Sequence, residues 1–433
     1  MFHMGWFVGQ GFSANGWTDF WAGNRVNTWM KPDLYMDLGR AMERSGFDYM
    51  MLEDASLIPD TFNGSMETYL KYGMSAPKND PVTLVPLVGH VTSRLGIIAT
   101  ITTSFYHPFM AARLMSSLDH ITDGRVGANL VTAHSPRGAQ NYGRPALAEH
   151  DTRYRMAREW VQVADQLWNS WEDGAVLGDL ETPRLVDHTK VHTIDFEGEF
   201  FSSRGPLNTI PSPQRRPVIC QAGGSPAGRE FAAEVADTII AGGKSVEAMK
   251  SYRDDITERM LRFGRNPTDC KVLMTANPVL GETNEEAREK KRRQQAENDD
   301  KLDYFLAALS YTTAIDMGKF DLDAPLPDGL TTDGAQSILT DIQRIANGRT
   351  LREIAIGPKD ADSALFVGTP DAVASMMGDI IDESGADGFL LGNPIDRRSV
   401  SEITDGLMPA LQRRGLVRDH YEHALFRDNL LAF

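Results

Sequence analysis

The chain has 433 residues, of which 41% are hydrophobic and 24% are charged, so it can bury a large core. Its 44 Lys and Arg against 60 Asp and Glu leave a formal net charge of −16, and such an acidic surface repels the phosphates of nucleic acids and anionic lipids. We therefore expect neither a nucleic-acid partner nor a membrane partner.

Short apolar runs alternate with longer amphipathic stretches almost from the first residue, and this alternation predicts repeated strand-helix units. The predicted strands span 2–8, 47–53, 95–101, 126–131, 218–222, 238–241, 272–279 and 385–391. The predicted helices span 33–45, 81–92, 108–121, 152–171, 226–236, 246–263, 369–384 and 400–413, and a further helix begins near 283. The charge run at 286–301 in that further helix indicates a face exposed to solvent.

Eight such units favour a closed (β/α)8 TIM barrel over an open doubly wound sheet, because an open sheet usually stops nearer six strands. Two stretches interrupt the repeat. Residues from about 174 to 217 hold scattered Pro and Gly with a predicted small hairpin at 192–201, and residues from about 304 to 362 are irregular. We predict one α/β domain, residues 1–433, with both stretches as insertions on the barrel rim.

Cys220 and Cys270 each lie inside an apolar run, which is typical of buried reduced thiols rather than of a disulfide. No Cys/His cluster has the spacing of a zinc site, so we predict no bound metal. Residues 1–8 form a short apolar run without a basic flank, and no stretch approaches the ~20 apolar residues of a membrane span. We therefore expect a cytoplasmic protein.

In a barrel of this kind the active site lies at the carboxyl ends of the strands, so polar residues at those ends are the candidates. They are Glu53 and Asp54 at strand two; Thr100, Thr102 and Thr103 at strand three; Asn129 and residues 132–135, including His134, at strand four; and Gly223, Gly224 and Ser225 at strand five.

The Gly223–Ser225 turn joins a strand to a helix, and such a turn presents free amides and a hydroxyl to a phosphate; plain tight packing is the alternative. His150 and Tyr154 share one face of the next helix upstream, where they either face a ligand or cap and pack the helix. Helix and turn follow neighbouring strands. Together they could enclose a phosphorylated cofactor, with Asn129 and the strand-three threonines facing a flat ring.

Five strings resemble, in order and spacing, the flavin-dependent monooxygenases of the bacterial luciferase-like superfamily: NLVTAHSPRGAQNYG, EHDTRYRMAREW, LWNSWEDGA, FEGEFFSSRGPLN and PVICQAGGSPAGREFAA. The nearest branch contains the nitrilotriacetate, dibenzothiophene-sulfone and long-chain alkane monooxygenases. The resemblance covers residues from about 2 to 265, with a weaker echo around 384–394.

This resemblance implies an FMN-binding barrel that takes reduced FMN from a separate NAD(P)H:flavin reductase, by diffusion or transient contact. It implies that the flavin reacts with O2 to form a flavin hydroperoxide and that one oxygen atom passes to a small organic substrate. We expect a homodimer or homotetramer. The family's flavin contacts carry over to Asp54, Thr100, Asn129, His150, Tyr154, Gly224 and Ser225, and the barrel geometry adds Thr102.

Such an intermediate decays if water reaches it, so we expect both insertions to act as lids. A proton donor is needed beside the flavin, and His134 is our candidate catalytic residue; a solvated loop histidine is the alternative.

The loop after strand one is rich in aromatic residues, and we predict that Phe12, Trp17 and Arg25 bind substrate; packing of the barrel mouth is the alternative. The loop lacks the Cys/His pattern of the alkane branch, which argues against a simple alkane as substrate. It also has few basic residues, which argues against a chelator with several carboxylates. An aromatic or heteroaromatic substrate is favoured. Two other functions stay open: a deazaflavin-dependent hydride-transfer oxidoreductase and a non-catalytic flavin-binding protein.

Overall fold

The computed structural model describes residues 1–9, 30–243, 245–327, 329–332, 334–346, 348–357 and 366–433. Eight parallel strands form a closed barrel: β1 (His3–Val8), β2 (Tyr49–Leu52), β3 (Gly96–Thr102), β4 (Val126–Val131), β9 (Val218–Gln221), β10 (Thr238–Ala241), β11 (Lys271–Ala276) and β14 (Gly388–Leu391). Each strand pairs with the next one along the chain, and β14 pairs with β1. The predicted (β/α)8 barrel is confirmed.

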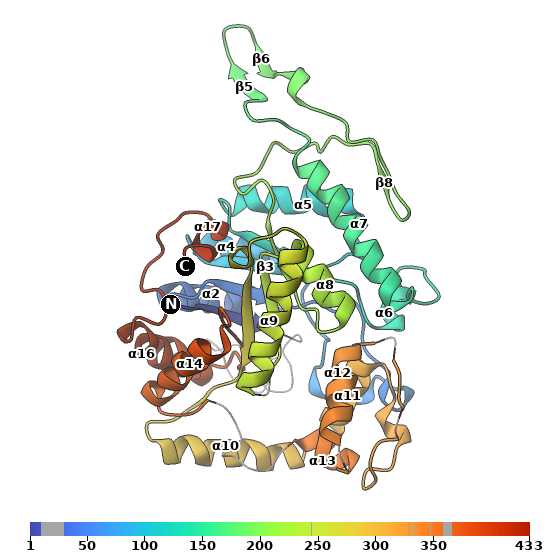
Figure 1. Cartoon of the computed structure of the whole chain (residues 1–433), viewed down its shortest axis with the longest axis vertical. Helices are drawn as coiled ribbons and strands as arrows, with labels where there is room; N and C mark the ends of the chain where they lie inside the picture. Colours follow the sequence, from blue (N-terminus) through green and yellow to red (C-terminus); the bar gives the residue numbers. More distant parts are fainter. Residues whose placement is uncertain (10–29, 244, 328, 333, 347, 358–365) are drawn as a thin grey trace.

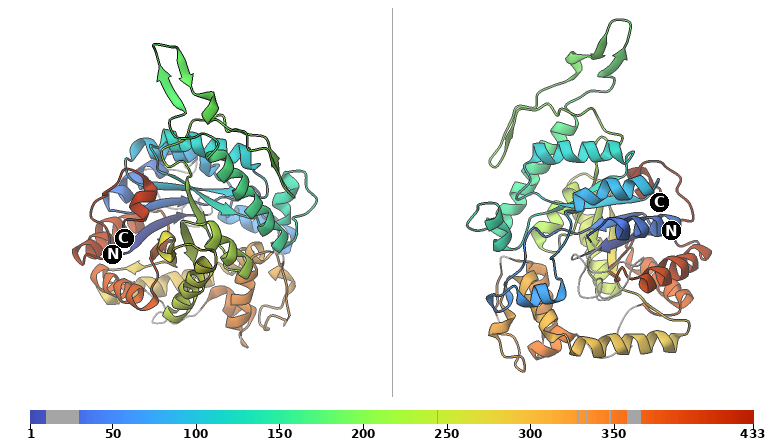
Figure 2. Two further views of the ribbon diagram at one scale, coloured as in Figure 1. Left: turned by 45° about the horizontal axis from the view of Figure 1, so that its top comes forward. Right: turned by 180° about the vertical axis from the view of Figure 1, so that it is seen from behind.

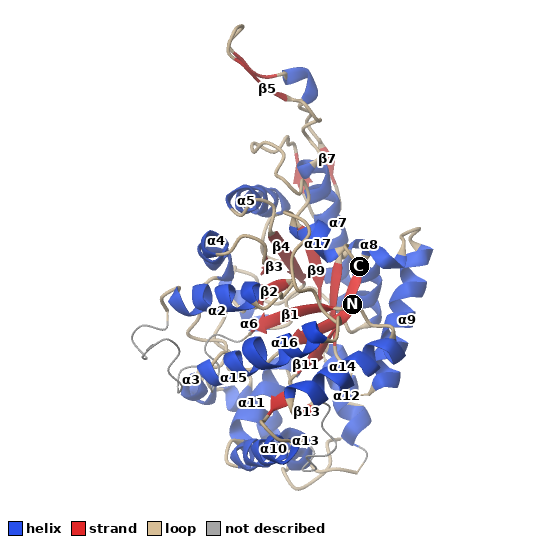
Figure 3. Cartoon of the chain, turned by 90° about the vertical axis from the view of Figure 1, so that its left-hand side faces the viewer, coloured by secondary structure: helices blue, strands red, loops and turns tan. Residues whose placement is uncertain are grey.

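Helices surround the barrel, as Figures 1 and 3 show. They are α2 (Asp33–Arg44), α4 (Pro81–Val91), α5 (Pro108–Ile121), α7 (His150–Trp168), α8 (Pro226–Val235), α9 (Val246–Arg262), α14 (Pro370–Ser384), α15 (Arg397–Ser401) and α16 (Met408–Arg413). In α2 the apolar stripe Leu34, Leu38 and Met42 is fully buried against the strands, as its helical spacing predicts. Among the described residues, no helix combines the length and the apolar character needed to span a bilayer.

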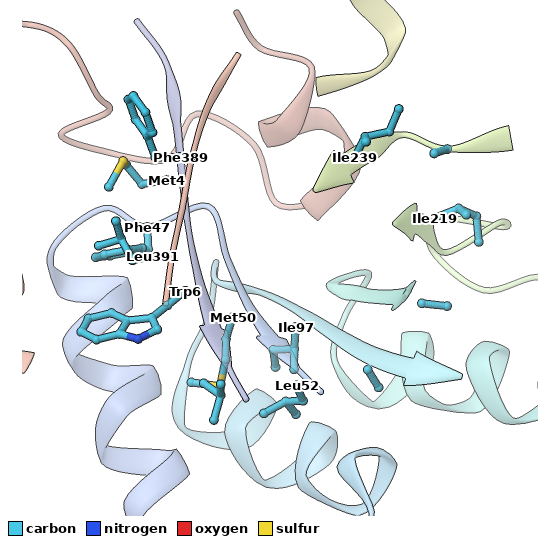
Figure 4. Packing of buried hydrophobic residues seen from close by; sticks show 14 of the residues in the cluster. Met4, Trp6, Phe47, Met50, Leu52, Ile97, Ile219, Ile239, Phe389 and Leu391 are labelled. Atoms are coloured by element: carbon cyan, nitrogen blue, oxygen red, sulfur yellow. The ribbon is translucent and has the colours of Figure 1, made fainter. Parts of the chain in front are cut away.

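The barrel wall separates two apolar layers, because successive side chains of a strand point to opposite faces. The outer layer includes Met4 and Trp6 and packs under the helices, and Figure 4 shows part of it. The inner layer includes Met51, Leu273 and Leu390. Near the carboxyl ends of the strands the inward side chains line a cavity instead of filling the interior.

The amino end of the barrel is plugged from inside by α17 (Phe426–Leu430). Phe426 and Leu430 belong to the inner apolar layer, and the Phe426 ring lies 5.9 Å from that of Tyr49. Glycines on two strands make room for it: a Cβ built on Gly96 would lie 2.5 Å from the Phe426 ring, and one built on Gly127 would lie 3.4 Å from it.

A buried ion pair holds the chain segment that carries this plug. Arg418 donates to Asp48 Oδ1 from Nη2 at 2.7 Å and from Nε at 3.0 Å, and Nη2 also donates to the carbonyl oxygen of Asn429 at 2.7 Å. Burial acts to raise the pKa of Asp48, but His3 and Arg418 beside it hold that pKa below its ordinary value. The pair therefore stays charged and joins β2 to the C-terminal segment.

The first insertion follows α7 and contains two antiparallel pairs, β5 (Val176–Asp179) with β6 (Arg184–Val186) and β7 (Phe196–Glu197) with β8 (Ser202–Ser203). Its outer hairpin projects away from the barrel, as Figures 1 and 2 show. The expectation that residues 174–217 form a lid is wrong. Because α7 starts at the carboxyl end of the strands and runs back to the amino end, this insertion emerges far from the cavity, and none of its residues lines it.

The second insertion lies at the barrel mouth and is mostly helical, with α11 (Leu302–Thr313), α12 (Gln336–Ala346) and α13 (Leu351–Ile356). It is preceded by β12 (Val279–Leu280) and α10 (Asn284–Asp299) and followed by β13 (Val367–Gly368), which pairs with β12. It packs on η1 (Phe62–Gly64) and α3 (Glu67–Tyr72) through a separate apolar cluster that includes Phe62, Tyr69, Leu306, Tyr311 and Leu351. This insertion, unlike the first, supplies residues to the cavity.

Replacing Phe426 with Ala should lower the free energy of unfolding by about 3 to 5 kcal/mol, since it removes a fully buried ring and leaves a void inside the barrel. Urea unfolding measures this change. Phe263→Ala is the matched control, because that ring is 39% exposed at the end of α9 and its loss should cost less than about 1 kcal/mol. Equal effects of the two substitutions would contradict the plug.

Candidate active site

A cavity of about 550 Å³ opens at the carboxyl ends of the strands, a volume typical of sites for small ligands. The predicted residues that line it are Asp54, Thr100, Thr102, Asn129, His134, His150, Tyr154, Gly224 and Ser225. Barrel closure therefore brings residues from five segments of the chain into one site. Phe12, Trp17 and Arg25 lie outside the described residues.

The floor of the cavity is formed by inward side chains of neighbouring strands. Thr100 and Asn129 are cross-strand partners, and Asn129 Nδ2 donates to Thr100 Oγ1 at 3.0 Å. Asn129 is only 3% exposed, yet its Oδ1 has no hydrogen-bond partner. A buried acceptor without a partner costs about 1 to 3 kcal/mol, so this oxygen points to a ligand that carries an N–H or O–H donor.

The predicted contact between α7 and the Gly223–Ser225 turn is present. Ser225 caps α8, with its Oγ accepting from the Gly228 N–H at 3.1 Å, and the same Oγ lies 3.2 Å from His150 Nε2. The Tyr154 hydroxyl lies against this turn, 2.7 Å from a Cβ built on Gly228. Ser225, His150 and Tyr154 thus meet at the positive end of the α8 dipole, which is suited to an anion.

The glycines of this turn serve different purposes. A Cβ on Gly223 would lie 2.5 Å from the backbone of Gly228, so that glycine is required by tight packing. Gly224, in contrast, lines the cavity. Tight packing therefore accounts for Gly223, whereas the interpretation of Gly224 as part of a phosphate site stays a prediction.

A buried cation also lines the cavity. Arg153 is 2% exposed, lines the cavity and donates from Nη1 to the carbonyl oxygen of Ala148 at 2.7 Å. A guanidinium that stays charged in a low-dielectric site attracts an anion strongly. The cavity thus contains a positive charge even though the net charge of the protein is negative.

Carboxylates lie on the opposite wall. Glu53 forms an ion pair with Lys78, and Asp54 follows directly. Burial is the main cause that raises the pKa of Asp54 to about 6 from an ordinary value of 3.8; Lys78 opposes the shift and Glu53 adds to it. Asp54 can therefore change its protonation state near neutral pH, as groups in functional sites commonly do.

His134 is buried in the cavity wall rather than solvated. Its Nε2 has no hydrogen-bond partner and is shielded from solvent, and burial lowers the pKa of the ring. The imidazole is therefore neutral at neutral pH. The Tyr311 ring from α11 packs edge-on against it, with 4.7 Å between ring centroids.

Several lining residues were not predicted from the sequence. They include Gln221 at the end of β9, Thr275 and Asn277 at the end of β11, Tyr311 at the end of α11, and Gly334–Ile338 before and at the start of α12. Strand-end position could have marked Gln221, Thr275 and Asn277, since each lies within one residue of the end of a barrel strand. Nothing in the local sequence marks Tyr311 or Gly334–Ile338, because they enter the site only through the packing of the second insertion.

The described part of the chain holds no group of three or more His, Cys, Asp or Glu side chains arranged to bind a metal ion. The polar groups of the cavity are instead hydrogen-bond donors and acceptors, a cation and carboxylates, and apolar side chains such as Phe7, Ile240 and Leu390 line the cavity with them.

Comparison with known proteins identifies the family. The chain matches the luciferase-like monooxygenase family over residues 16–388. It belongs to this family. It is 35% identical over 410 residues to the long-chain alkane monooxygenase of Geobacillus thermodenitrificans, which covers 94% of this chain and 89% of that enzyme. It is also 35% identical over 405 residues to nitrilotriacetate monooxygenase component A of Aminobacter aminovorans, covering 92% and 89% of the two chains.

The solved structures agree with this assignment. A crystal structure of riboflavin lyase with modified FMN and its substrate riboflavin superposes with a TM-score of 0.88 at 28% identity, covering 100% of this chain and 96% of that one. The resemblance to the branch of alkane and nitrilotriacetate monooxygenases is confirmed, and the protein is a flavin-dependent monooxygenase.

The raised pKa of Asp54 makes a prediction about stability. Its folded-state pKa of about 6 lies above the ordinary value of 3.8, so ionising it costs more in the folded state than in the unfolded state. This cost is absent below about pH 4, grows as the pH rises and is complete above about pH 6. The free energy of unfolding of the wild type, measured in urea and compared with that of Asp54→Asn, should therefore fall across this window.

Lys78→Met supplies the control for this titration. Because Lys78 opposes the shift, its removal should move the window to higher pH. If the free energies of unfolding of wild type and Asp54→Asn differ by the same amount at every pH from 4 to 7, the raised pKa of Asp54 is contradicted.

Proposed function

We propose that this monooxygenase uses reduced FMN, supplied by a separate NAD(P)H:flavin reductase, and O2 to oxygenate a small aromatic or heteroaromatic compound. The observation that carries the proposal is a single cavity with two distinct ends: an anion seat at Ser225, His150 and Tyr154, and an unpartnered buried Asn129 Oδ1 on the floor. A flavin mononucleotide has a phosphate and a planar ring with N–H donors. The phosphate matches the anion seat, and a ring N–H matches the unpartnered Asn129 Oδ1.

The residues present fit FMN. Ser225, Tyr154 and His150 would hold the phosphate, with Arg153 supplying positive charge beside them. Asn129 would accept from a ring N–H, and its cross-strand partner Thr100 with Thr102 would line the ring's edge. Bound reduced FMN would supply the two electrons with which O2 is divided, one oxygen atom going to the substrate and the other to water, while the flavin is oxidised.

The role of His134 is to hold a proton at the reacting end. A neutral imidazole with an unpartnered Nε2 can donate one hydrogen bond into the cavity without carrying charge there. Tyr311 fixes the plane of the ring by packing edge-on against it. Burial also raises the pKa of Tyr311, so its phenol stays protonated. The tautomer that places the proton on Nε2 is part of the proposal.

The floor supports an uncharged substrate. The inward side chains at the ends of β1, β10 and β14 are Phe7, Ile240 and Leu390, and β11 adds Thr275 and Asn277. These residues offer apolar surface with a hydroxyl and an amide, and none of them carries a charge. An aromatic ring with a carbon, sulfur or nitrogen atom to be oxidised suits such a surface better than a polycarboxylate.

The reductase is supported by a relative that is named as component A of its monooxygenase, which implies a second component there. The single-domain organisation, the homodimer or homotetramer and the cytoplasmic location expected from the sequence stay predictions.

A turnover assay tests the proposed function. With a working reductase, NADH and ¹⁸O2, the purified protein should add one ¹⁸O atom to a member of a panel of heteroaromatic and organosulfur compounds, measured by mass spectrometry. His134→Gln should lower the yield of product per reduced FMN and raise that of hydrogen peroxide. His188→Gln, an exposed histidine in the first insertion, should change neither.

Two outcomes would overturn the proposal. One is peroxide alone for every compound in the panel. The other is tighter binding of a deazaflavin than of FMN, which would favour hydride transfer.

FMN affinity tests the anion seat directly. Ser225→Ala and Tyr154→Phe should each weaken binding by about 1 to 2 kcal/mol, since each removes a hydrogen bond to a charged group. Quenching of flavin fluorescence measures the affinity. Ser117→Ala, on the outer side of α5, is the matched control and should leave the titration unchanged. Unchanged curves for both seat variants would remove them from the phosphate site.

A further inference from the structure

The second insertion brings a hydroxyl to the anion end of the cavity. Ser337 stands in the first turn of α12, and its Oγ lies 2.6 Å from a Cβ built on Gly224. Both residues line the cavity. Among the described residues, Ser337 Oγ takes part in no hydrogen bond. The hydroxyl is therefore free to bind a ligand that lies in the cavity beside the Gly223–Ser225 turn.

Two helix starts meet at this place. α8 begins after Ser225, and α12 begins at Gln336; residues at both starts line the same cavity. The first turn of a helix carries the positive end of its dipole, so both helices turn a positive end toward the cavity here. An anion that lies beside both starts would be stabilised by both dipoles.

Side chains in the adjoining wall indicate a ligand independently of the helix starts. Gln221 ends β9 beside the turn, is 2% exposed, lines the cavity and has an Oε1 without a hydrogen-bond partner. The buried Arg153 supplies positive charge in the same cavity. A buried amide oxygen without a partner indicates a ligand that carries a hydroxyl or N–H donor, and the ribityl hydroxyls next to a flavin phosphate are such donors.

We propose that the phosphate of the cofactor is clamped at the junction where the starts of α8 and α12 meet, with Ser337 donating a hydrogen bond to it, and that the phosphate thereby holds the second insertion closed. This inference rests on the proposed use of FMN. It adds Ser337, a residue from outside the eight strand-helix units, to the phosphate site. It also means that bound phosphate stabilises the closed position of the second insertion.

The clamp is connected to the reacting end of the cavity. The Ala335 N–H donates to the carbonyl oxygen of Thr312 at 3.0 Å, and Thr332 Oγ1 donates to that of Thr313. Tyr311, which packs against His134, directly precedes Thr312. Holding the start of α12 at the phosphate therefore also holds the end of α11 that positions the His134 ring.

Riboflavin separates the contribution of the phosphate from that of the ring, because it has the same ring and no phosphate. In fluorescence titrations, Ser337→Ala should weaken FMN binding about 5- to 10-fold and leave riboflavin binding unchanged. Ser337→Asp, whose carboxylate repels the phosphate, should weaken FMN binding about 50-fold or more. Thr340→Ala is the control, since Thr340 is exposed on the same helix; it should change neither affinity.

Hydrogen exchange of residues 334–346 provides a readout independent of affinity. FMN should slow exchange there in the wild type, riboflavin should slow it less, and the difference should vanish in Ser337→Ala. If wild-type protein binds FMN no more tightly than riboflavin, the proposed phosphate seat fails and this inference with it. If wild-type protein prefers FMN but both Ser337 variants bind FMN as tightly as the wild type does, only the clamp is overturned. The same holds if the variants weaken riboflavin binding as much as FMN binding.

Discussion

Closure of the barrel is the constraint on which the rest of the structure depends. Because eight parallel strands pair in sequence and β14 returns to β1, all of their carboxyl ends lie on one rim. Alternation then divides each strand into residues that face the helices and residues that face the axis. Phe426 fills the axis at the amino end, whereas polar and smaller inward residues at the carboxyl end leave the cavity. The site is thus a consequence of closure.

Local electrostatics in this cavity differ from those of the whole molecule. The protein carries a formal net charge of −16, yet the seat at Ser225 combines a helix start with the buried Arg153. Low dielectric strengthens these few charges and dipoles, while the surface carboxylates are screened by solvent. The net charge therefore informs on macromolecular partners but not on which ions the interior binds.

The two insertions show where prediction from the sequence reached its limit. Both were expected to cover the flavin; among the described residues, the second insertion lines the cavity through Tyr311 and Gly334–Ile338, and the first does not line it. The stretch 174–217 leaves from the far end of α7, so its location follows from the direction of that helix rather than from its own irregular composition. Tyr311 and Ser337 were missed for a related reason, since no strand or motif in their neighbourhood points to a site.

The sequence by itself determined the barrel, its strand order and the strand-end residues of the site, because hydrophobic periodicity and strand-end position are local properties and closure makes strand ends converge. The family motifs agreed with those positions, from Asp54 to Ser225. Only the tertiary structure decided that His134 is buried beside Tyr311, that Asn129 Oδ1 lacks a partner and that α12 meets α8. These depend on contacts between segments far apart in the chain, which no local pattern encodes.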